Sequence, residues 1–295
     1  MLKRTLVFSN AVNLTLKNMQ LVISFKEIER EPTSVPIEDI GCVIIENQRV
    51  CITIPLINAL ADSNVQVIFC NNKNMPNSML YNLDNNITQG ETLRNQMAVG
   101  ETLKKQMWKQ IVEAKIRNQS RLLDKIGCNG AILRPYYQNV KSGDADNREG
   151  IAARLYFQEL MGKNFVRDRQ MFGINALLNY GYTILRAAVA RSLVASGLFP
   201  AIGIYHHHRS NAFPLADDMM EPYRPYVDEA VYEMICEGEI ELTQMVKTRL
   251  INVLYTDTYF EKVTRPLSVG LSLSSASLVR CYSKEQNTLT FPLLQ

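Results

Sequence analysis

The pattern of hydrophobic and polar positions changes near residue 85. Before it, short runs of Val, Ile, Leu and Phe are bounded by Asn, Gly or Pro, as in "RTLVFSN", "GCVIIEN" and "VQVIFCN", and such runs predict β-strands. In "LTLKNMQLVIS" a polar turn separates two runs, which predicts a hairpin that turns at Lys17-Asn18 or Asn18-Met19. The segment "IPLINALADSN" predicts a short helix. Residues 1–85 are therefore predicted to form a β-rich domain with one short helix.

An Asn-rich segment, about residues 71–90, is predicted to be a linker, and beyond it apolar residues recur at helical spacing. In residues 91–127, Leu103, Met107 and Ile111 lie four positions apart, which places them on one face of a helix. Further helical patterns cover residues 144–162, 170–197 and 225–240. The sequence thus predicts an α+β fold, in which the small mostly-β domain is followed by an all-α domain over residues 91–295.

The composition is that of a globular protein. A chain of 295 residues with 46% hydrophobic residues can bury the cores of two domains. The N-terminal segment lacks the apolar region of a signal peptide. Arg186 and Arg191 interrupt the longest apolar stretch, residues 184–204, which favours a buried helix over a membrane span. The six cysteines include no CxxC pair, which argues against a zinc cluster. We expect a soluble, cytoplasmic protein with no membrane association.

The charge is distributed unevenly along the chain. Residues 1–85 carry 7 Lys/Arg against 8 Asp/Glu, whereas residues 92–125 carry 8 against 3. Lys and Arg contacts to phosphate supply most of the non-specific affinity for nucleic acids, so a basic helical domain fits a DNA or RNA partner. A solvated helix face accounts for the same charges equally well.

The candidate chemistry lies in one short stretch. The chain's three histidines are consecutive: His206, His207 and His208. Three acids follow: Asp217, Asp218 and Glu221. Imidazole with carboxylates is a ligand set for divalent metals, although a histidine run by itself more often lies at the surface or in a core. Consecutive residues cannot all reach one ion, so we expect one histidine, or two at most, in any site.

The spacing of the acids leaves two arrangements open. Asp218 and Glu221 lie three positions apart and would share one face of a helix. Asp217 and Glu221, four apart, would do the same, so the spacing does not choose between the aspartates. Pro222 and Pro225 also predict a helix start here, in which case an aspartate would only cap the helix.

A further carboxylate, Glu149, lies just inside the start of a predicted helix. Asp146 and Glu149 have the spacing of a capping box, which gives the glutamate a structural role. A carboxylate at a helix N-terminus also stays ionised, which suits a metal ligand.

Four cations are candidate DNA contacts: Arg209, Arg224, Lys109 and Lys115. The guanidinium group binds phosphate through two parallel hydrogen bonds, which favours the arginines. An ion pair between Arg224 and Glu221 or Asp228 is an equally supported alternative.

Three motifs together resemble the CRISPR-associated adaptation integrase, the universal nuclease that inserts new spacers into CRISPR arrays. One is the glycine-rich approach to His206 through Gly197, Pro200 and Gly203. The second is "DDMMEPYRP", which is similar to the family's "DLMEPFRP", and the third is "NREGIAARLYF" around Glu149. "PIEDIGCVIIEN" and "WKQIVEAKIRNQ" also resemble the family, so the likeness covers the whole chain. It is greatest to the subtype II-A branch.

The resemblance implies that Glu149, His206 and Glu221 bind Mg²⁺ or Mn²⁺, with Asp218 close by in the catalytic set. Many family members have aspartate where this chain has Glu221. The implied reaction is attack by the 3′-hydroxyl of a DNA fragment on a phosphodiester at the edge of a repeat, with the metal as Lewis acid. Such a transesterification needs no nucleotide cofactor, and the chain has no GxxxxGK[ST] motif.

The resemblance also implies partners. They are prespacer duplex and CRISPR repeat or leader DNA, a second copy of the chain bound through the β domain, and a dimer of a small ferredoxin-like adaptation protein, which completes a heterohexamer. In the II-A branch a ring-shaped DNA-end protein and the RNA-guided effector nuclease take part. A hydrolytic metal-dependent nuclease of DNA repair and a non-catalytic DNA-binding scaffold are the alternative functions. We also hypothesise that the tail from Ser283 to Gln295 docks on a partner.

Overall fold

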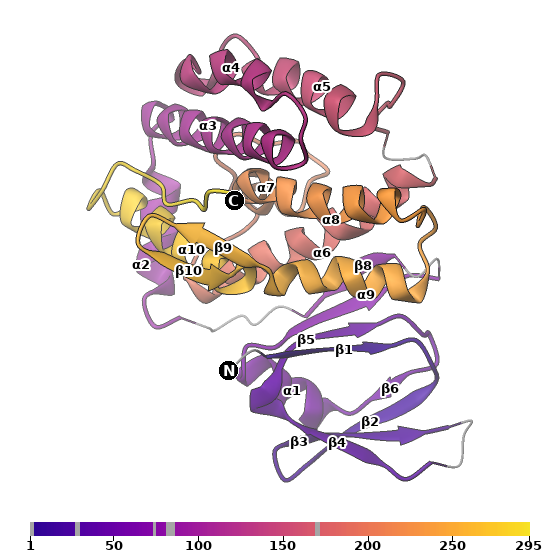
Figure 1. The fold of residues 1–295 in the computed structure, drawn as a ribbon. Helices are drawn as coiled ribbons and strands as arrows, with labels where there is room; N and C mark the ends of the chain where they lie inside the picture. Colours follow the sequence, from indigo (N-terminus) through magenta and orange to yellow (C-terminus); the bar gives the residue numbers. More distant parts are fainter. Residues whose placement is uncertain (1–2, 27–29, 73–74, 81–85, 169–171) are drawn as a thin grey trace. The chain divides into compact units, whose positions relative to one another are not determined.

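The computed structural model describes residues 3–26, 30–72, 75–80, 86–168 and 172–295. Its contacts form two compact units, Met1–Asn85 and Asn86–Gln295 (Figure 1). The first unit is rich in strands and the second is mainly helical, so the predicted α+β class is confirmed. The predicted linker and the helix predicted from residue 170 lie partly outside the described residues, at 73–74, 81–85 and 170–171.

The N-terminal unit contains two four-stranded sheets. The first has the order β1 (Arg4–Phe8), β5 (Ile40–Ile45), β7 (Gln66–Cys70), β8 (Pro76–Met79). The second has the order β4 (Thr33–Pro36), β3 (Gln20–Phe25), β2 (Val12–Lys17), β6 (Cys51–Ile52). In the first sheet β1, β5 and β7 are parallel, and β8 pairs antiparallel to β7. In the second, β3 is antiparallel to both neighbours, and β6 is parallel to β2.

The predicted hairpin and short helix are both present. Lys17 of β2 pairs with Gln20 of β3, so the turn consists of Asn18 and Met19. Both turn residues have positive φ, 50° and 56°, as the right-handed twist of a two-residue hairpin favours. The helix is α1 (Ile54–Asp62), which follows β6.

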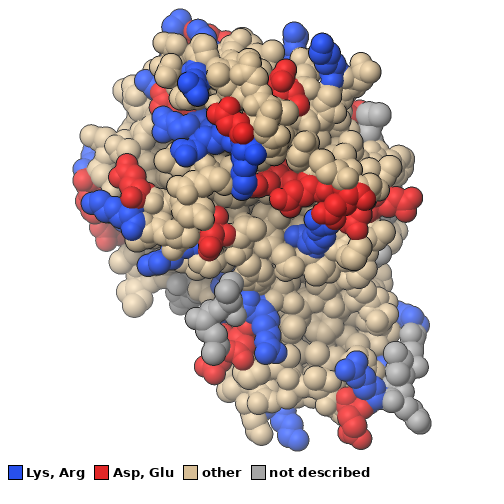
Figure 2. Space-filling view, viewed as in Figure 1, with Lys and Arg blue, Asp and Glu red and all other residues tan. Residues whose placement is uncertain are grey.

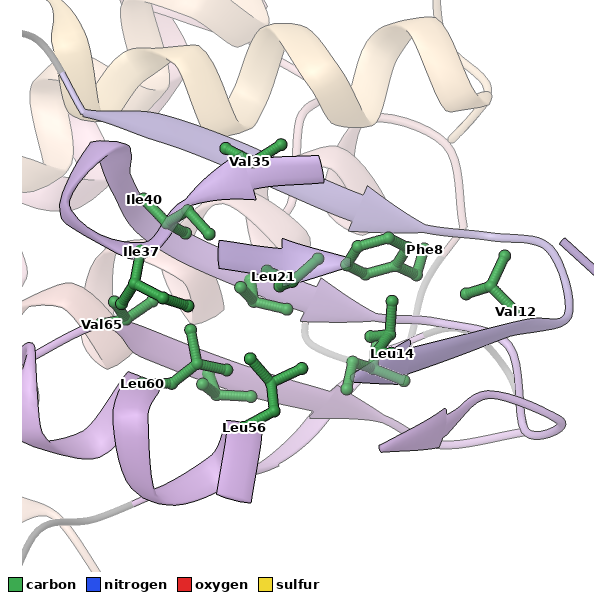
Figure 3. Packing of buried hydrophobic residues seen from close by; sticks show 13 residues of the cluster. Phe8, Val12, Leu14, Leu21, Val35, Ile37, Ile40, Leu56, Leu60 and Val65 are labelled. Carbon is green, nitrogen blue, oxygen red and sulfur yellow. The ribbon is translucent and has the colours of Figure 1, made fainter. Parts of the chain in front are cut away.

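The core of this unit is formed by alternate residues of the strands together with one face of α1 (Figure 3). Val12 and Leu14 of β2 are buried, while Asn13 between them is exposed, as the period of a half-buried strand requires. Leu56 and Leu60, four residues apart on α1, are both fully buried. The strands and α1 therefore share a single hydrophobic core.

Four short strands among the described residues were not predicted. β4, with the sequence "TSVP", pairs at the edge of the second sheet. β8 lies inside the segment predicted as a linker; its sequence, "PNSM", is polar and it pairs at the edge of the sheet. β9 (Asp257–Phe260) and β10 (Val263–Pro266) form an antiparallel hairpin, so the domain predicted to be all-α also contains strands. Each strand has only four residues, too few to show a clear period of two.

The second unit contains nine of the described α-helices: α2 (Gln89–Ala98), α3 (Glu101–Lys125), α4 (Arg134–Gln138), α5 (Arg148–Met161), α6 (Ile174–Ala195), α7 (Pro214–Met220), α8 (Arg224–Cys236), α9 (Gln244–Asn252) and α10 (Leu267–Tyr282). Five short 3₁₀ turns occur among the described residues: η1 (Ile37–Asp39), η2 (Gly130–Leu133), η3 (Ser142–Asp144), η4 (Glu221–Tyr223) and η5 (Val253–Tyr255). α3 packs against α4, α5, α7, α8 and η4. Figure 1 shows α4 and α5 along one side of α3.

One face of α3 begins as an apolar stripe and continues as a polar one. Met107 and Ile111 are fully buried, as their spacing predicts. Further along the helix, Lys115, Asn118 and Gln119 are buried as well. Buried polar groups require partners: Lys115 pairs with Glu149 of α5 and Glu221 of η4, and Asn118 donates a hydrogen bond to the Pro222 carbonyl of η4.

The helix predicted for the apolar stretch 184–204 ends earlier than expected. α6 ends at Ala195, and Gly197 follows with φ of 78°, a left-handed conformation that commonly terminates helices. The remaining apolar residues form a loop that leads to His206. None of the helices within the described ranges has the length and apolar character to cross a membrane.

The C-terminal tail packs on α3 of its own chain. The Gln110 side chain accepts a hydrogen bond from the Leu289 N–H (2.7 Å) and donates one to the Asn287 carbonyl (2.9 Å). Asn118 accepts from the Leu294 N–H (3.1 Å), and the Leu294 side chain is buried. The tail therefore binds α3 of its own chain, and its docking on a partner stays a prediction.

Two neighbouring leucines of the tail test this packing. Leu294→Ala removes buried methyl groups and should lower the free energy of unfolding by about 2–4 kcal/mol. Leu293→Ala, at a half-buried position, should cost clearly less. Urea unfolding of both variants measures the difference, and equal losses would contradict the packing of Leu294 on the helical unit.

Candidate active site

The side chain of Lys115 lies between two carboxylates from distant parts of the sequence. Its Nζ is 2.5 Å from Oε1 of Glu149 and 2.5 Å from Oε2 of Glu221. The three residues come from α3, α5 and η4. Lys115 and Glu221 are buried, and the Glu149 side chain is 24% exposed. The fold therefore gathers two of the predicted metal ligands at one point.

Two neighbouring side chains place Glu149 at the start of α5. Asn147, with φ of 53°, is the N-cap and accepts a hydrogen bond from the Gly150 N–H (3.3 Å). Asp144 accepts from the Glu149 N–H (3.0 Å). The predicted capping box of Asp146 and Glu149 is therefore wrong. Because other residues cap the helix, the Glu149 carboxylate is not needed at the helix N-terminus. It pairs instead with Lys115 of α3.

Glu221 is ionised despite its burial. Its Oε1 accepts a hydrogen bond from Nε of Arg224 (2.9 Å), three residues along the chain. Burial alone would raise the pKa of Glu221, but the positive charges of Arg224 and Lys115 outweigh it and lower the pKa to about 2. Burial would likewise lower the pKa of Lys115, but Glu221 and Glu149 raise it above its ordinary value. At neutral pH the Glu221 carboxylate therefore lies between one ammonium and one guanidinium group.

Asp218 fixes the loop that carries His206. Its fully buried carboxylate accepts hydrogen bonds from the backbone N–H groups of Ile204 (2.6 Å), Tyr205 (3.1 Å) and His206 (3.1 Å). It also lies 2.7 Å from Nδ1 of the His206 ring, and this hydrogen bond raises the pKa of His206. Gly203 is required here, because a Cβ atom would approach the His206 carbonyl oxygen to 2.3 Å.

The structure separates the two aspartates that the spacing left equivalent. Asp217 contacts Nε of Arg186 (2.6 Å) and Nδ2 of Asn211 (2.7 Å), away from the His206 ring. Neither Asp217 nor Asp218 caps a helix, since the N-cap of α7 is Phe213 and no side chain bonds there. Asp218 is thus the aspartate beside His206.

Only one of the three histidines faces this site. Nδ1 of His207 contacts the Tyr205 carbonyl (2.6 Å), Nδ1 of His208 contacts Oγ of Ser210 (2.9 Å), and both histidines are exposed. The expectation of one histidine in the site, or two at most, therefore fits this arrangement. The buried Trp108 of α3 lies edge-on to the His206 ring, with 5.5 Å between the centroids.

The predicted DNA contacts lie in unlike environments. Lys115 is buried between two carboxylates, which does not fit a surface contact to phosphate. Arg224 pairs with Glu221 and lies over the Tyr182 ring (4.5 Å), as the ion-pair alternative required. Arg209 is exposed, and Lys109 is half-buried, 3.7 Å from Glu113. On the face shown in Figure 2, basic groups of the helical unit lie next to acidic ones.

The donor set fits a divalent cation in its chemistry. Glu149 and Glu221 supply hard oxygen donors, and the hydrogen bond of Asp218 to Nδ1 leaves Nε2 of His206 for a ligand. Oε2 of Glu221 is buried and accepts no hydrogen bond from any described residue. Within the described ranges, however, no three His, Cys, Asp or Glu side chains are close enough together to hold a metal ion. The ammonium of Lys115 lies between the two carboxylates instead.

The position of Lys115 between the two carboxylates was not predicted from the sequence. A signal for it exists, because Lys115 continues the four-residue spacing of Met107 and Ile111 and therefore occupies a buried position of α3. A lysine in an apolar stripe needs a buried acid as its partner. The motif containing Asp217 and Glu221 gave no comparable signal for Arg186, which lies on a different helix.

Comparison with known proteins identifies a family. The sequence profile of the family described as "CRISPR associated protein Cas1" matches residues 5–267. The chain is 40% identical over 263 residues to the CRISPR-associated endonuclease Cas1 of Neisseria meningitidis serogroup C (strain 8013), a match that covers 88% of this chain and 85% of that protein.

Two solved structures share the fold. A casposase bound to integration product has a TM-score of 0.80 at 21% identity, covering 98% of this chain and 92% of that one. A chain of a Cas6-RT-Cas1–Cas2 complex has a TM-score of 0.74 at 21% identity, covering 99% of this chain and 36% of that one. At such identities the structural likeness establishes the fold alone.

The environment of His206 predicts a pH effect. Asp218→Asn removes the charged acceptor, so the pKa of His206 should fall toward its ordinary value of 6.5. Because the native pKa is raised, the protonated imidazole contributes stability that is fully present below pH 6.5 and is lost as the pH rises through the native pKa. An NMR titration of the imidazole resonances measures the pKa of His206 in wild type and in Asp218→Asn.

Asp217→Asn is the matched control, since Asp217 bonds to Arg186 and Asn211 rather than to the imidazole. It should leave the pKa of His206 closer to the wild-type value. Equal pKa values for His206 in the two variants would contradict the role given to Asp218.

Proposed function

This chain belongs to the CRISPR-associated Cas1 family, and we propose that it is a metal-dependent DNA integrase of CRISPR adaptation. In the proposed reaction the 3′-hydroxyl of a prespacer attacks a phosphodiester at a repeat boundary, so that one phosphodiester is exchanged for another. The endonuclease name of the Neisseria relative and the integration product bound by the casposase support a reaction at DNA phosphodiesters.

The convergence of Glu149 and Glu221 is the observation that carries this proposal. They lie far apart in the sequence, on α5 and η4, yet both carboxylates reach the same ammonium group. His206 lies in the same short stretch of the sequence as Glu221, and the buried Asp218 holds it in place. A non-catalytic scaffold has no need to bury like charges together, because their mutual repulsion costs stability.

We propose that Glu149, His206 and Glu221 hold Mg²⁺ or Mn²⁺. When bound, the ion would supply Lewis-acid stabilisation of charge at the scissile phosphate. The protein's own groups prepare the donors: Arg224 keeps Glu221 ionised, and Asp218 directs His206 by its hydrogen bond to Nδ1. Asp218 thus acts as a positioning residue behind the histidine.

The proposed partners follow from the family. We propose a homodimer formed through the N-terminal unit, and a heterohexamer with a dimer of the small ferredoxin-like adaptation protein. One structural neighbour was solved in a Cas6-RT-Cas1–Cas2 complex, which supports assembly with such a partner. Prespacer duplex and repeat DNA are the proposed nucleic-acid ligands, and Arg209 and Lys109 are the proposed phosphate contacts.

Loss of one proposed ligand tests the reaction. Glu149→Ala or His206→Ala should lower the rate of strand transfer into a plasmid carrying one repeat by more than about a hundredfold, because proposed metal ligands would be lost. The assay contains the small partner, Mn²⁺ and a duplex with 3′-hydroxyl ends. DNA affinity, measured by fluorescence anisotropy, should stay largely unchanged.

Glu159→Ala is the control, since Glu159 is exposed on the same helix, α5. It should leave strand transfer intact, and blocked 3′ ends should abolish the reaction. Nicking that ignores both the repeat and the 3′ end would establish the hydrolytic nuclease instead. Loss of DNA binding in proportion to activity would show that Glu149 is structural.

The two arginines should differ in their effect on DNA binding. Arg209→Ala removes a surface cation and should reduce the slope of log K against log salt by about 1. Arg224→Ala should leave this slope unchanged, because Arg224 already pairs with Glu221. Anisotropy titrations over a range of salt concentrations measure both slopes, and an unchanged slope for Arg209→Ala would rule out its phosphate contact.

A further inference from the structure

Lys115 occupies the position that links the two carboxylates. Its Nζ lies 2.5 Å from one oxygen of Glu149 and 2.5 Å from one of Glu221, and no more than 10% of its side chain is exposed. An ammonium group at this depth is stabilised only by such charges. Removal of this cation would take away the ion pair of Glu149 with α3 and would leave Glu221 with Arg224 as its partner.

We propose that Lys115 is the resident cation of this site, which keeps Glu149 and Glu221 assembled without metal and competes with a divalent ion for both carboxylates. This inference rests on the proposed metal-dependent function. It assigns to Lys115 a role in setting metal affinity, and not a contact with DNA phosphate.

The two cations of the site differ in how firmly they are held. The guanidinium of Arg224 donates a hydrogen bond from Nε to Oε1 of Glu221 and lies over the Tyr182 ring at 4.5 Å. Nζ of Lys115 donates a hydrogen bond to Oε1 of Glu149 and lies 2.5 Å from Oε2 of Glu221. Lys115 thus contacts both of the carboxylates that the ion would bind, whereas Arg224 contacts Glu221 and is also held over an aromatic ring. Lys115 is therefore the cation that a competing ion would displace.

The chemistry of lysine suits displacement. Its charge is a compact ammonium on a flexible four-carbon stem, which can move while the stem stays packed. A divalent ion carries twice the charge toward the same two carboxylates, so exchange is favourable once the ion is present in sufficient concentration. Metal affinity is then the net result of binding the ion and releasing the ammonium.

The experiment compares Mn²⁺ binding at one fixed pH in wild type, Lys115→Met and Lys115→Gln. Calorimetry gives the midpoint of binding, and thermal unfolding gives the melting temperature with and without Mn²⁺. Without metal, both variants should melt about 5–10 °C below wild type, because the buried Glu221 and the half-buried Glu149 lose the cation that they share. The Mn²⁺ midpoint should fall by about tenfold, which is 1.4 kcal/mol, because the competing cation is gone.

Lys125→Met is the matched control. Lys125 lies on the same helix and also pairs with an acid of another helix, Glu229 at 2.6 Å, but far along α3 from Glu149. The Lys125→Met variant should leave the Mn²⁺ midpoint unchanged. A variant of Lys115 that folds only in Mn²⁺ would show the ion taking over the role of the ammonium. If both variants are unfolded without metal and Mn²⁺ restores the folding of neither, the proposal is overturned.

Two outcomes separate this inference from the proposed function. The metal-dependent function fails if Glu149→Gln does not remove Mn²⁺ binding, either from wild type or from Lys115→Met. If wild type binds Mn²⁺ through Glu149 and Lys115→Met leaves the midpoint unchanged or weakens it, that function stands and the role of Lys115 is overturned.

Discussion

The burial of the Glu221 carboxylate beside Lys115 and Arg224 is the constraint on which the helical unit depends. A carboxylate with 4% of its side chain exposed must be paired, because removal of one partner from a buried pair typically costs about 3–5 kcal/mol. The partners here come from α3 and α8, and Lys115 brings in Glu149 from α5. One set of charges therefore fixes three helices relative to one another, and it does so at the site of the proposed reaction.

α3 connects this site with the rest of the unit. The Asn118 side chain donates hydrogen bonds to the carbonyl of Pro222, next to Glu221, and to that of Pro292 in the tail. It also accepts one from the Leu294 N–H. A single buried amide thereby ties the turn that carries Glu221 to the C-terminus of the chain. Packing of the tail and placement of the Glu221 carboxylate are for this reason parts of one hydrogen-bond network. A displacement of the tail therefore also affects the position of the turn that carries Glu221.

Sequence reasoning succeeded where a local period or a contiguous motif carries the information. Most strands of the N-terminal unit, the hairpin of β2 and β3, and α1 follow from short-range patterns, although the pattern left two positions open for the turn. The same reasoning limits the site to one histidine of the run, or two at most. Interactions across the chain were not accessible in this way. The period of α3 places Lys115 on a buried face but does not say which acid it meets, and the capping of α5 by Asn147 was hidden by the equally regular spacing of Asp146 and Glu149.

The length of the glutamate side chain at position 221 has a physical meaning in this network. Its two oxygens make separate contacts, Oε1 with Arg224 and Oε2 with Lys115. The turn η4 sets the distance of its backbone from α3, since the Pro222 carbonyl is held by Asn118 at 2.8 Å. An aspartate is one methylene shorter, so it would have to give up one of the two cations or draw η4 toward α3. The longer side chain thus lets this chain compensate the buried carboxylate on both sides without moving the backbone.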